Sequence, residues 1–298
     1  MAVSALKVTP TWRKFNLDLD IPDIDTEYRR KKMKFSYDQW EDTIVQSNRY
    51  GVCMKKGLRP YMEDAYRAIE NFHGKSDAFG VFDGHSGNSA SKFASQKLLD
   101  SLEKTDEESI KKAFEATDKA YCSLNTSQEG GSTAAIAIIE DNLLKVANVG
   151  DSKILLISEE ETEILSRDHL ASDLSEQTRI EQAGGYVFPV GKVFRVHGQL
   201  AISRSLGDAK LKEFVISEPY VAERQINKND LALVIATDGL FDVLNKEEIA
   251  KIVRSAENLK PFQVAEMLVQ EAMIKGSRDN ITCIVVSIRG YGSFNNCI

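Results

Sequence analysis

The stretch STAAIAIIEDNLLKVANVGDSKILLIS, residues 132–158, consists of three short apolar segments separated by a few polar residues. Segments of this kind, rich in Ile, Leu, Val and Ala, are typical of β-strands. A crossover between parallel strands needs about a dozen residues or more, and the link formed by residues 140–142 is too short for one. The first two segments are therefore expected to pair antiparallel, as a hairpin.

Similar segments continue on both sides of this stretch. Further strands are expected in RYGVCM (49–54), DAYRAI (64–69), AFGVFD (78–83), YVAERQI (220–226), LALVIATD (231–238) and ITCIVVSI (281–288). Helices are expected at about 86–102, 107–124, 172–182, 246–255 and 261–273. Because strands joined by short links are interrupted here by pairs of helices, the sequence predicts the α+β fold class with antiparallel sheets.

The N-terminal segment differs from the rest, and we divide the chain into an extension at 1–47 and a single domain at 48–298. Between Phe15 and Ile21 apolar and polar residues alternate, which is typical of an extended arm laid against a globular body. The basic cluster at 28–34 matches either a nuclear or anionic-surface signal or, more simply, a solvated charged face.

The composition bounds the class of protein and its partners. A hydrophobic fraction of 42% with 28% charged residues is ordinary for a globular protein. The net charge of −7 argues against nucleic acid as a partner, because phosphate backbones require a basic surface. No apolar run reaches the ~18 residues of a membrane span, and the four cysteines show no paired spacing. We therefore expect a cytoplasmic monomer, with the nucleus as a second location.

Acidic residues adjoin the ends of many of the expected strands. They are Glu63, Asp64, Asp83, Asp151, Asp238, Asp242 and Asp279. Each one alone is a common turn signal, since Asp-Gly favours turns for backbone reasons. If they converge, however, their mutual repulsion requires a cation to neutralise it.

The histidines restrict which metal such a cluster could hold. The chain contains only four, His73, His85, His169 and His197, and no two of them have the spacing of zinc ligands. A metal would therefore be bound by oxygen atoms, which favours Mg²⁺ or Mn²⁺.

Eight motifs together resemble the metal-dependent serine/threonine protein phosphatases of type 2C, and they occur in the order typical of that family. The motifs are RPYMEDAY (59–66), FGVFDGHSG (79–87), GSTA (131–134), NVGDSK (148–153), SRDH (166–169), LAISRSLGD (200–208), ATDGLFDV (236–243) and GSRDN (276–280). The resemblance extends over residues 49–288, about four-fifths of the chain.

The resemblance implies an antiparallel β-sandwich of two sheets flanked by helix pairs, an αββα arrangement with a two-metal site at one end. In this pattern Asp83 would bridge two Mg²⁺ or Mn²⁺ ions. Asp238 and Asp279 would complete the protein ligands of one ion. The carbonyl of Gly84 would serve the other, with Glu63 acting directly or through water.

The same resemblance implies roles for the remaining acidic residues. Asp64 would orient metal-bound waters. Asp151 and Asp242, with Asp238, match positions that hold a weaker third cation in some members. Asn280 would support the aspartate that precedes it.

The implied activity is hydrolysis of phosphoserine and phosphothreonine monoesters in phosphorylated proteins. Metal binding lowers the pKa of water, so a hydroxide bridging the two ions would form near neutral pH. This hydroxide would attack phosphorus in line. Arg59 would clamp the phosphate oxygens, and His85 would protonate the departing alkoxide as a general acid. We interpret His169, Asp208 and Thr133 as structural residues of their motifs. His197 departs from the family pattern, since many members have asparagine there, and it is expected in the flap region near the substrate channel.

Two other functions compete with this interpretation. Cys53 and Arg59 satisfy the C-x5-R spacing of cysteine-dependent phosphatases, but Pro60 disfavours the helix that should begin there. A catalytically weak or inactive phosphatase-fold interaction protein is the other alternative. It is disfavoured because the acidic residues of the metal pattern, including Asp83 and Asp238, are present.

Overall fold

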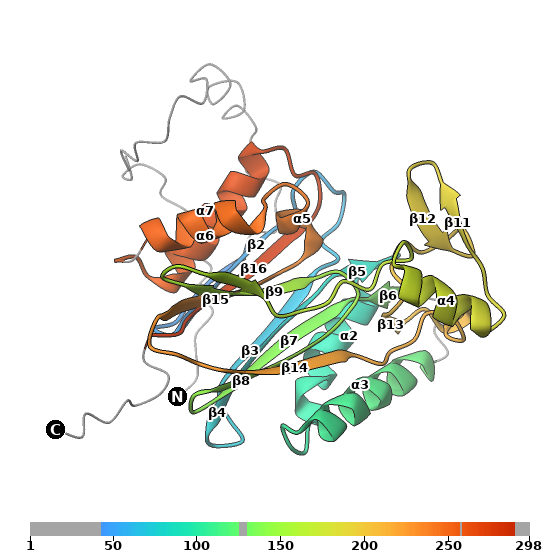
Figure 1. Cartoon of the computed structure of the whole chain (residues 1–298), viewed down its shortest axis with the longest axis horizontal. Helices are drawn as coiled ribbons and strands as arrows, with labels where there is room; N and C mark the ends of the chain where they lie inside the picture. Colours follow the sequence, from blue (N-terminus) through green and yellow to red (C-terminus); the bar gives the residue numbers. More distant parts are fainter. Residues whose placement is uncertain (1–42, 125–129, 257, 290–298) are drawn as a thin grey trace.

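The computed structural model describes residues 43–124, 130–256 and 258–289, which form four layers (Figure 1). Two antiparallel sheets pack face to face, and each carries helices on its outer side. The predicted α+β sandwich is therefore confirmed. The basic cluster and most of the predicted arm lie outside the described residues.

One sheet has six strands in the order β1-β2-β16-β15-β9-β10, and every neighbouring pair is antiparallel. Its strands are β1 (Thr43–Gln46), β2 (Tyr50–Lys55), β9 (Lys153–Ser158), β10 (Thr162–Ile164), β15 (Asp230–Ala236) and β16 (Ile281–Ser287). Strand β1 comes from the end of the predicted N-terminal extension and forms an edge of the sheet.

The other sheet has five strands in the order β14-β8-β7-β4-β3, again all antiparallel. Its strands are β3 (Ala65–Phe72), β4 (Ser76–Phe82), β7 (Ala134–Glu140), β8 (Leu143–Val149) and β14 (Tyr220–Gln225). The expected hairpin is confirmed, because Glu140 of β7 pairs with Leu143 of β8 across a two-residue turn. Asp141 in that turn has φ +55°, a left-handed conformation that aspartate tolerates.

The helices begin where the sequence supplies capping residues. Asp106 accepts a hydrogen bond from the Ser109 N–H at the start of α3, and Asn245 forms a reciprocal capping box with Glu248 at the start of α6. The α-helices are α2 (Ser89–Lys97), α3 (Glu107–Cys122), α4 (Leu174–Gln182), α5 (Asp238–Phe241), α6 (Lys246–Ser255) and α7 (Pro261–Ile274). Short 3₁₀ turns lie at Leu99–Ser101 and Ala209–Leu211. No helix in the described part of the chain is long and apolar enough to span a membrane.

Alternation along the strands divides the core between layers. On β4, Phe79 and Val81 lie in the cluster between the two sheets, whereas Phe82 lies in the cluster under α2 and α3. On β15, Leu233 faces the other sheet and Val234 packs in the cluster under α6 and α7. Because both faces are covered, these strands are continuously apolar, which explains why the sequence pattern identified them.

The short elements were not predicted from the sequence. A small sheet has the order β13-β6-β5, formed by Leu206–Gly207, Gly131–Ser132 and Gly84–His85. The hairpin of β11 (Val187–Val190) and β12 (Val193–Val196) projects from the body beside α4, and we call it the flap hairpin (Figure 1). Strands of two to four residues are too short for a recognisable hydrophobic period.

Candidate active site

Most of the predicted acidic residues lie at one end of the sandwich because of the strand pairing. In the five-stranded sheet the end of β4 pairs with the start of β3, which brings Asp83 beside Asp64. In the six-stranded sheet the end of β15 pairs with the starts of β16 and β9, which brings Asp238 close to Asp279 and Asp151. We call these five aspartates the acid centre.

The carboxylates of the acid centre repel one another. Burial raises the pKa of Asp83 well above its usual range, and the charges of Asp64, Asp238 and Asp151 raise it further. Burial, as the largest cause, also raises the pKa of Asp64 to about 7, that of Asp238 to about 8 and that of Asp151 to about 6. Like charges gathered in a poorly solvated site are unfavourable unless a cation binds there.

Threonine hydroxyls hold the most deeply buried member of the acid centre. Oδ2 of Asp64 accepts hydrogen bonds from Thr282 Oγ1 at 2.7 Å and from Thr237 Oγ1 at 3.0 Å. The N–H of Thr282 donates in turn to Thr237 Oγ1. The Asp64 carboxylate is therefore fixed by two neighbouring strands of the other sheet, through Thr282 on β16 and Thr237 directly after β15.

Arg59 and Asp279 form an ion pair at the rim of the acid centre. Nη2 of Arg59 lies 2.6 Å from Oδ2 of Asp279, and the Arg59 side chain is about half exposed. Burial lowers the pKa of this guanidinium, but the charges of Asp279, Asp238 and Glu63 together raise it above its usual value. The guanidinium of Arg59, predicted to bind phosphate, thus lies beside a predicted metal ligand, Asp279.

Asn280 connects two loops through its side-chain amide. Its Oδ1 accepts from the N–H of Glu63 at 2.8 Å, and its Nδ2 donates to the carbonyls of Lys56 at 2.7 Å and Tyr61 at 3.0 Å. Only its backbone N–H reaches the Asp279 carboxylate. The side chain therefore supports the loop that carries Arg59 and Glu63.

Gly84 lies in close contact with the chain around Glu63. A Cβ at Gly84 would lie 2.5 Å from the Glu63 carbonyl oxygen and 2.8 Å from Ser91 Oγ, so no other residue fits without a shift. Ser91 Oγ donates to the same carbonyl, and the N–H of Gly87 donates to Glu63 Oε1. The two residues expected to serve one cation are thus adjacent.

His85 contacts a residue that the sequence did not connect with it. Its Nε2 lies 2.9 Å from both carboxylate oxygens of Asp208, which we had interpreted as structural. Thr133 exchanges backbone and side-chain hydrogen bonds with Asp83, which agrees with a structural position. Asp242 lies on the solvent side, but partial desolvation of its carboxyl, followed by the charge of Asp279, raises its pKa.

His169 and His197 lie away from these contacts. His169 is fully buried, and neither ring nitrogen has a hydrogen-bond partner among the described residues. Burial lowers its pKa to about 4, so the ring is neutral at physiological pH. His197 stacks between Tyr186 and Phe214, with ring centroids 4.0 and 4.4 Å away, at the base of the flap hairpin.

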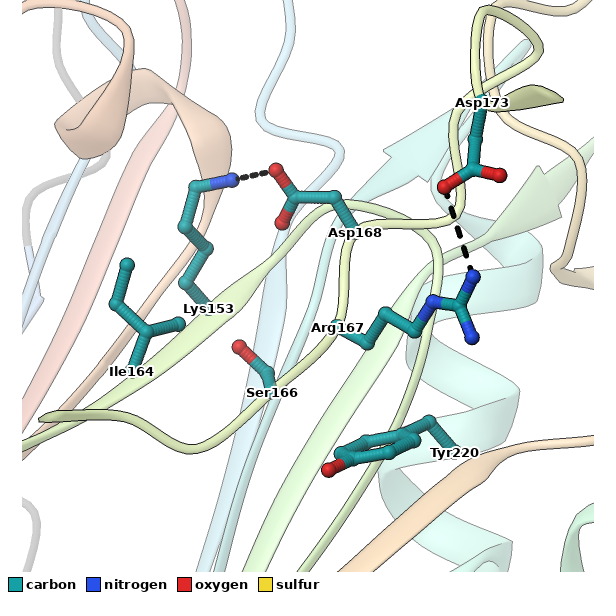
Figure 2. A pocket seen from close by; sticks show the side chains of 7 residues that line it. All are labelled: Lys153, Ile164, Ser166, Arg167, Asp168, Asp173 and Tyr220. Atoms are coloured by element: carbon teal, nitrogen blue, oxygen red, sulfur yellow. Dashed lines mark hydrogen bonds and ion pairs between the residues drawn. The ribbon is translucent and has the colours of Figure 1, made fainter. Parts of the chain in front are cut away.

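A pocket of about 460 Å³ lies around Lys153 and Arg167 (Figure 2). Lys153 pairs with Asp168 there, and Arg167 lies 3.6 Å from Asp173. The remaining lining residues are Ile164, Ser166 and Tyr220. The side chains of Lys153 and Arg167 are each paired with an aspartate. The charges that line the pocket therefore balance, and none is left over for a phosphate.

Comparisons with known proteins agree with the fold and the motifs. The family described as protein phosphatase 2C matches residues 48–281. A relative from Oryza sativa subsp. japonica, named probable protein phosphatase 2C 59, is 40% identical over 247 residues, covering 80% of this chain and 75% of its own length.

Solved structures agree as well. A C. elegans sex determining protein has TM-score 0.74 at 28% identity, covering 82% of this chain and 66% of that one. A serine-threonine phosphatase 2C from Toxoplasma gondii shares the fold with TM-score 0.72 at 21% identity, covering 83% of this chain and 98% of that one.

The sandwich and its relatives define the class of this protein, an enzyme that acts as a serine/threonine protein phosphatase. The chain belongs to the protein phosphatase 2C family. The cysteine-dependent alternative is wrong, because Cys53 is completely buried within β2.

Metal dependence is general in this family, and the donor set fits a hard cation. Oδ1 of Asp238 is buried without a hydrogen-bond partner in the described part of the chain. A carboxylate oxygen in this position either costs free energy or binds a ligand. Within the described ranges, no three Asp, Glu, His or Cys side chains already stand as a ligand cluster for one ion.

Proposed function

We propose that this phosphatase hydrolyses phosphoserine and phosphothreonine monoesters of proteins with two Mg²⁺ or Mn²⁺ ions held at the acid centre. One observation carries the proposal: buried carboxylates converge there without cationic partners. Among the described residues, Lys and Arg form ion pairs with neither Asp64, Asp83 nor Asp238, and the pKa of each of these aspartates is raised. A cation would relieve their repulsion.

The cations would be held by the carboxylates of Asp83, Asp238 and Asp279, with the Gly84 carbonyl and Glu63 completing the set. When bound, they would supply a nucleophile at neutral pH and neutralise charge on the phosphate.

The remaining acidic residues would have secondary roles. Asp64 is fixed by two threonine hydroxyls and so presents one defined oxygen to waters of the site. Asp242 lies on the solvent side and Asp151 is partly buried, and the two would hold a weaker third cation with Asp238.

Arg59 would bind and orient the phosphate. A guanidinium has five N–H donors in a planar fork, and in the structure one nitrogen contacts Asp279. The side chain is about half exposed, so its remaining donors are accessible to the oxygens of an incoming phosphate. The ion pair with Asp279 also fixes the orientation of the fork before substrate binds.

His85 would protonate the leaving group. A serine or threonine alkoxide departs poorly unless it receives a proton in the transition state. The His85 side chain is about one quarter exposed and lies two residues after Asp83, so it lies beside the proposed phosphate site. A partly exposed histidine can reach the leaving group of a bound substrate, whereas a fully buried one such as His169 cannot.

The proposal is tested by assaying the full chain on a phosphothreonine peptide with Mn²⁺ or Mg²⁺ and with EDTA. We expect EDTA to abolish hydrolysis and iodoacetamide to leave it intact, since Cys53 is buried. Calorimetry should detect Mn²⁺ binding that weakens at least ~10-fold in Asp238→Asn. The exposed variant Glu108→Gln is the matched control and should bind Mn²⁺ normally.

Three results would count against the proposal. Undiminished hydrolysis in EDTA would exclude the metal-dependent route, and normal Mn²⁺ binding by Asp238→Asn would exclude the assigned ligands. Mn²⁺ binding without hydrolysis of any phosphopeptide would favour the inactive interaction protein instead.

A further inference from the structure

The small sheet β13-β6-β5 brings His85 and Asp208 together above a glycine. Gly131 of β6 pairs with His85 of β5 on one side and with Gly207 of β13 on the other. A Cβ at Gly131 would lie 2.1 Å from Oδ2 of Asp208 and 2.8 Å from Nε2 of His85. The contact between the two side chains therefore requires glycine at this position.

The backbone and a neighbouring hydroxyl fix the Asp208 carboxylate. Asp208 has φ +51°, a left-handed conformation that few residues adopt, and it is 6% exposed. Ser205 Oγ donates to its Oδ2 at 2.5 Å, and both carboxylate oxygens lie 2.9 Å from His85 Nε2. A carboxylate buried to this extent needs hydrogen-bond partners, and these contacts supply them.

A second buried aspartate holds the loop from the other side. The N–H of Gly207 donates to Oδ1 of Asp118 on α3 at 2.8 Å, and Lys212 pairs with the same oxygen at 2.9 Å. Asp118 supports the loop, but among the described residues it forms no hydrogen bond with His85. The chain thus offers two buried carboxylates that hold one loop, Asp208 within it and Asp118 on α3, and of these Asp208 contacts the imidazole.

We propose that Asp208 is a positioning residue that holds the His85 ring in one orientation with its Nε2–H donated to the carboxylate. This inference rests on the proposed function, in which His85 is the general acid. The transferable proton is then on Nδ1. As the phosphorus–oxygen bond to the serine or threonine oxygen breaks, the alkoxide takes the Nδ1 proton, and the imidazolium becomes neutral imidazole with its remaining proton on Nε2.

Two substrates with different leaving groups distinguish this positioning role of Asp208 from a purely structural one. A nitrophenolate leaves without protonation, whereas a threonine alkoxide does not. For Asp208→Asn we expect kcat on a phosphothreonine peptide to fall about 100-fold, while kcat on p-nitrophenyl phosphate falls less than about threefold and KM stays unchanged. In a His85→Gln background, Asp208→Asn should cause no further loss on the peptide.

The matched control is Asp118→Asn, which makes the same isosteric change at a buried carboxylate on α3 that holds the same loop. It should lower the melting temperature and reduce both activities by the same factor. An equal loss on both substrates in Asp208→Asn, or additive losses with His85→Gln, would overturn the inference.

A spectroscopic test does not depend on Asp208→Asn folding. In ¹⁵N NMR spectra of the full chain, neutral His85 should be the Nε2–H tautomer, with the assignment made from the spectrum of His85→Gln. An Nδ1–H tautomer would overturn the inference. If the unaltered chain hydrolyses neither substrate, the proposed function itself fails, and the NMR result still decides whether Asp208 positions the ring.

Discussion

The buried carboxylate of Glu176 and the buried carboxylates of the acid centre behave in opposite ways. At the base of the flap hairpin, Glu176 of α4 accepts hydrogen bonds from Arg204, Arg179 and Ser203. Burial alone would raise its pKa, but the hydrogen bond and charge of Arg204, followed by the charge of Arg179, lower it to about 2. In the acid centre, burial and like charges raise the pKa values instead.

The difference separates a carboxylate that stabilises the fold from those that we propose bind cations. Glu176 joins α4 to the loop before Asp208, and its charge is fully compensated. Within the acid centre, Asp64, Asp83 and Asp238 are destabilising by the same reasoning, since among the described residues none of them forms an ion pair with Lys or Arg. Strained or unsatisfied groups of this kind cluster at functional sites.

The largest effect is expected for Asp83→Asn. Hydrolysis of a phosphothreonine peptide should fall by about 10³-fold or more, because the central proposed ligand loses its charge. The melting temperature of the metal-free protein should stay the same or rise, since one of several mutually repelling carboxylates is removed. Activity assays and thermal unfolding in EDTA measure the two effects. A clear fall in the metal-free melting temperature would show that Asp83 is structural.

A smaller effect with the opposite character is expected for Glu176→Gln. The folded pKa of about 2 lies below the ordinary value of 4.5, so the ionised group stabilises the fold at neutral pH and loses this effect as pH falls from 4.5 toward 2. The variant should lose about 2–3 kcal/mol of unfolding free energy at pH 7, and the difference from the parent should shrink below pH 4.5.

Urea unfolding at pH 7 and at several values below pH 4.5 checks the Glu176 prediction. A difference between variant and parent that stays constant with pH would contradict it. The result would then reflect packing of the side chain and not its charge.

The smallest effect is expected where a carboxylate is paired but exposed. Lys112 lies 2.6 Å from Glu108 on α3, and both side chains are largely exposed. We expect Lys112→Ala to leave the midpoint of urea unfolding unchanged within error, because water screens such pairs. A shift comparable to that of Glu176→Gln would mean that pairing matters at the surface as much as in the interior.

Sequence patterns predicted the sheets but not the way the site assembles. The apolar strands and the hairpin at residues 140–143 followed from composition and link length, and both are confirmed. Convergence of Asp83 with Asp238 depends on strand order, which local spacing does not encode. It was expected only through the resemblance to type 2C phosphatases.

The partnership of His85 with Asp208 was missed for a related reason. The two residues are 123 positions apart, and two-residue strands join them through Gly131. The available signal was the glycine before each partner, Gly84 and Gly207, together with the glycine pair at 130–131. Glycines next to polar residues indicate close backbone approach, but they do not say which chains approach.

The amide of Asn280 has a consequence for how substrate binds. Because it joins Glu63, Lys56 and Tyr61, the loop between them is ordered as soon as the sheet forms. Fixing the backbone of a loop opposes association by about 1–2 kcal/mol per residue when it happens on binding. Here that conformational entropy is lost during folding, so under the proposed function Arg59 would bind a phosphate from a preorganised loop.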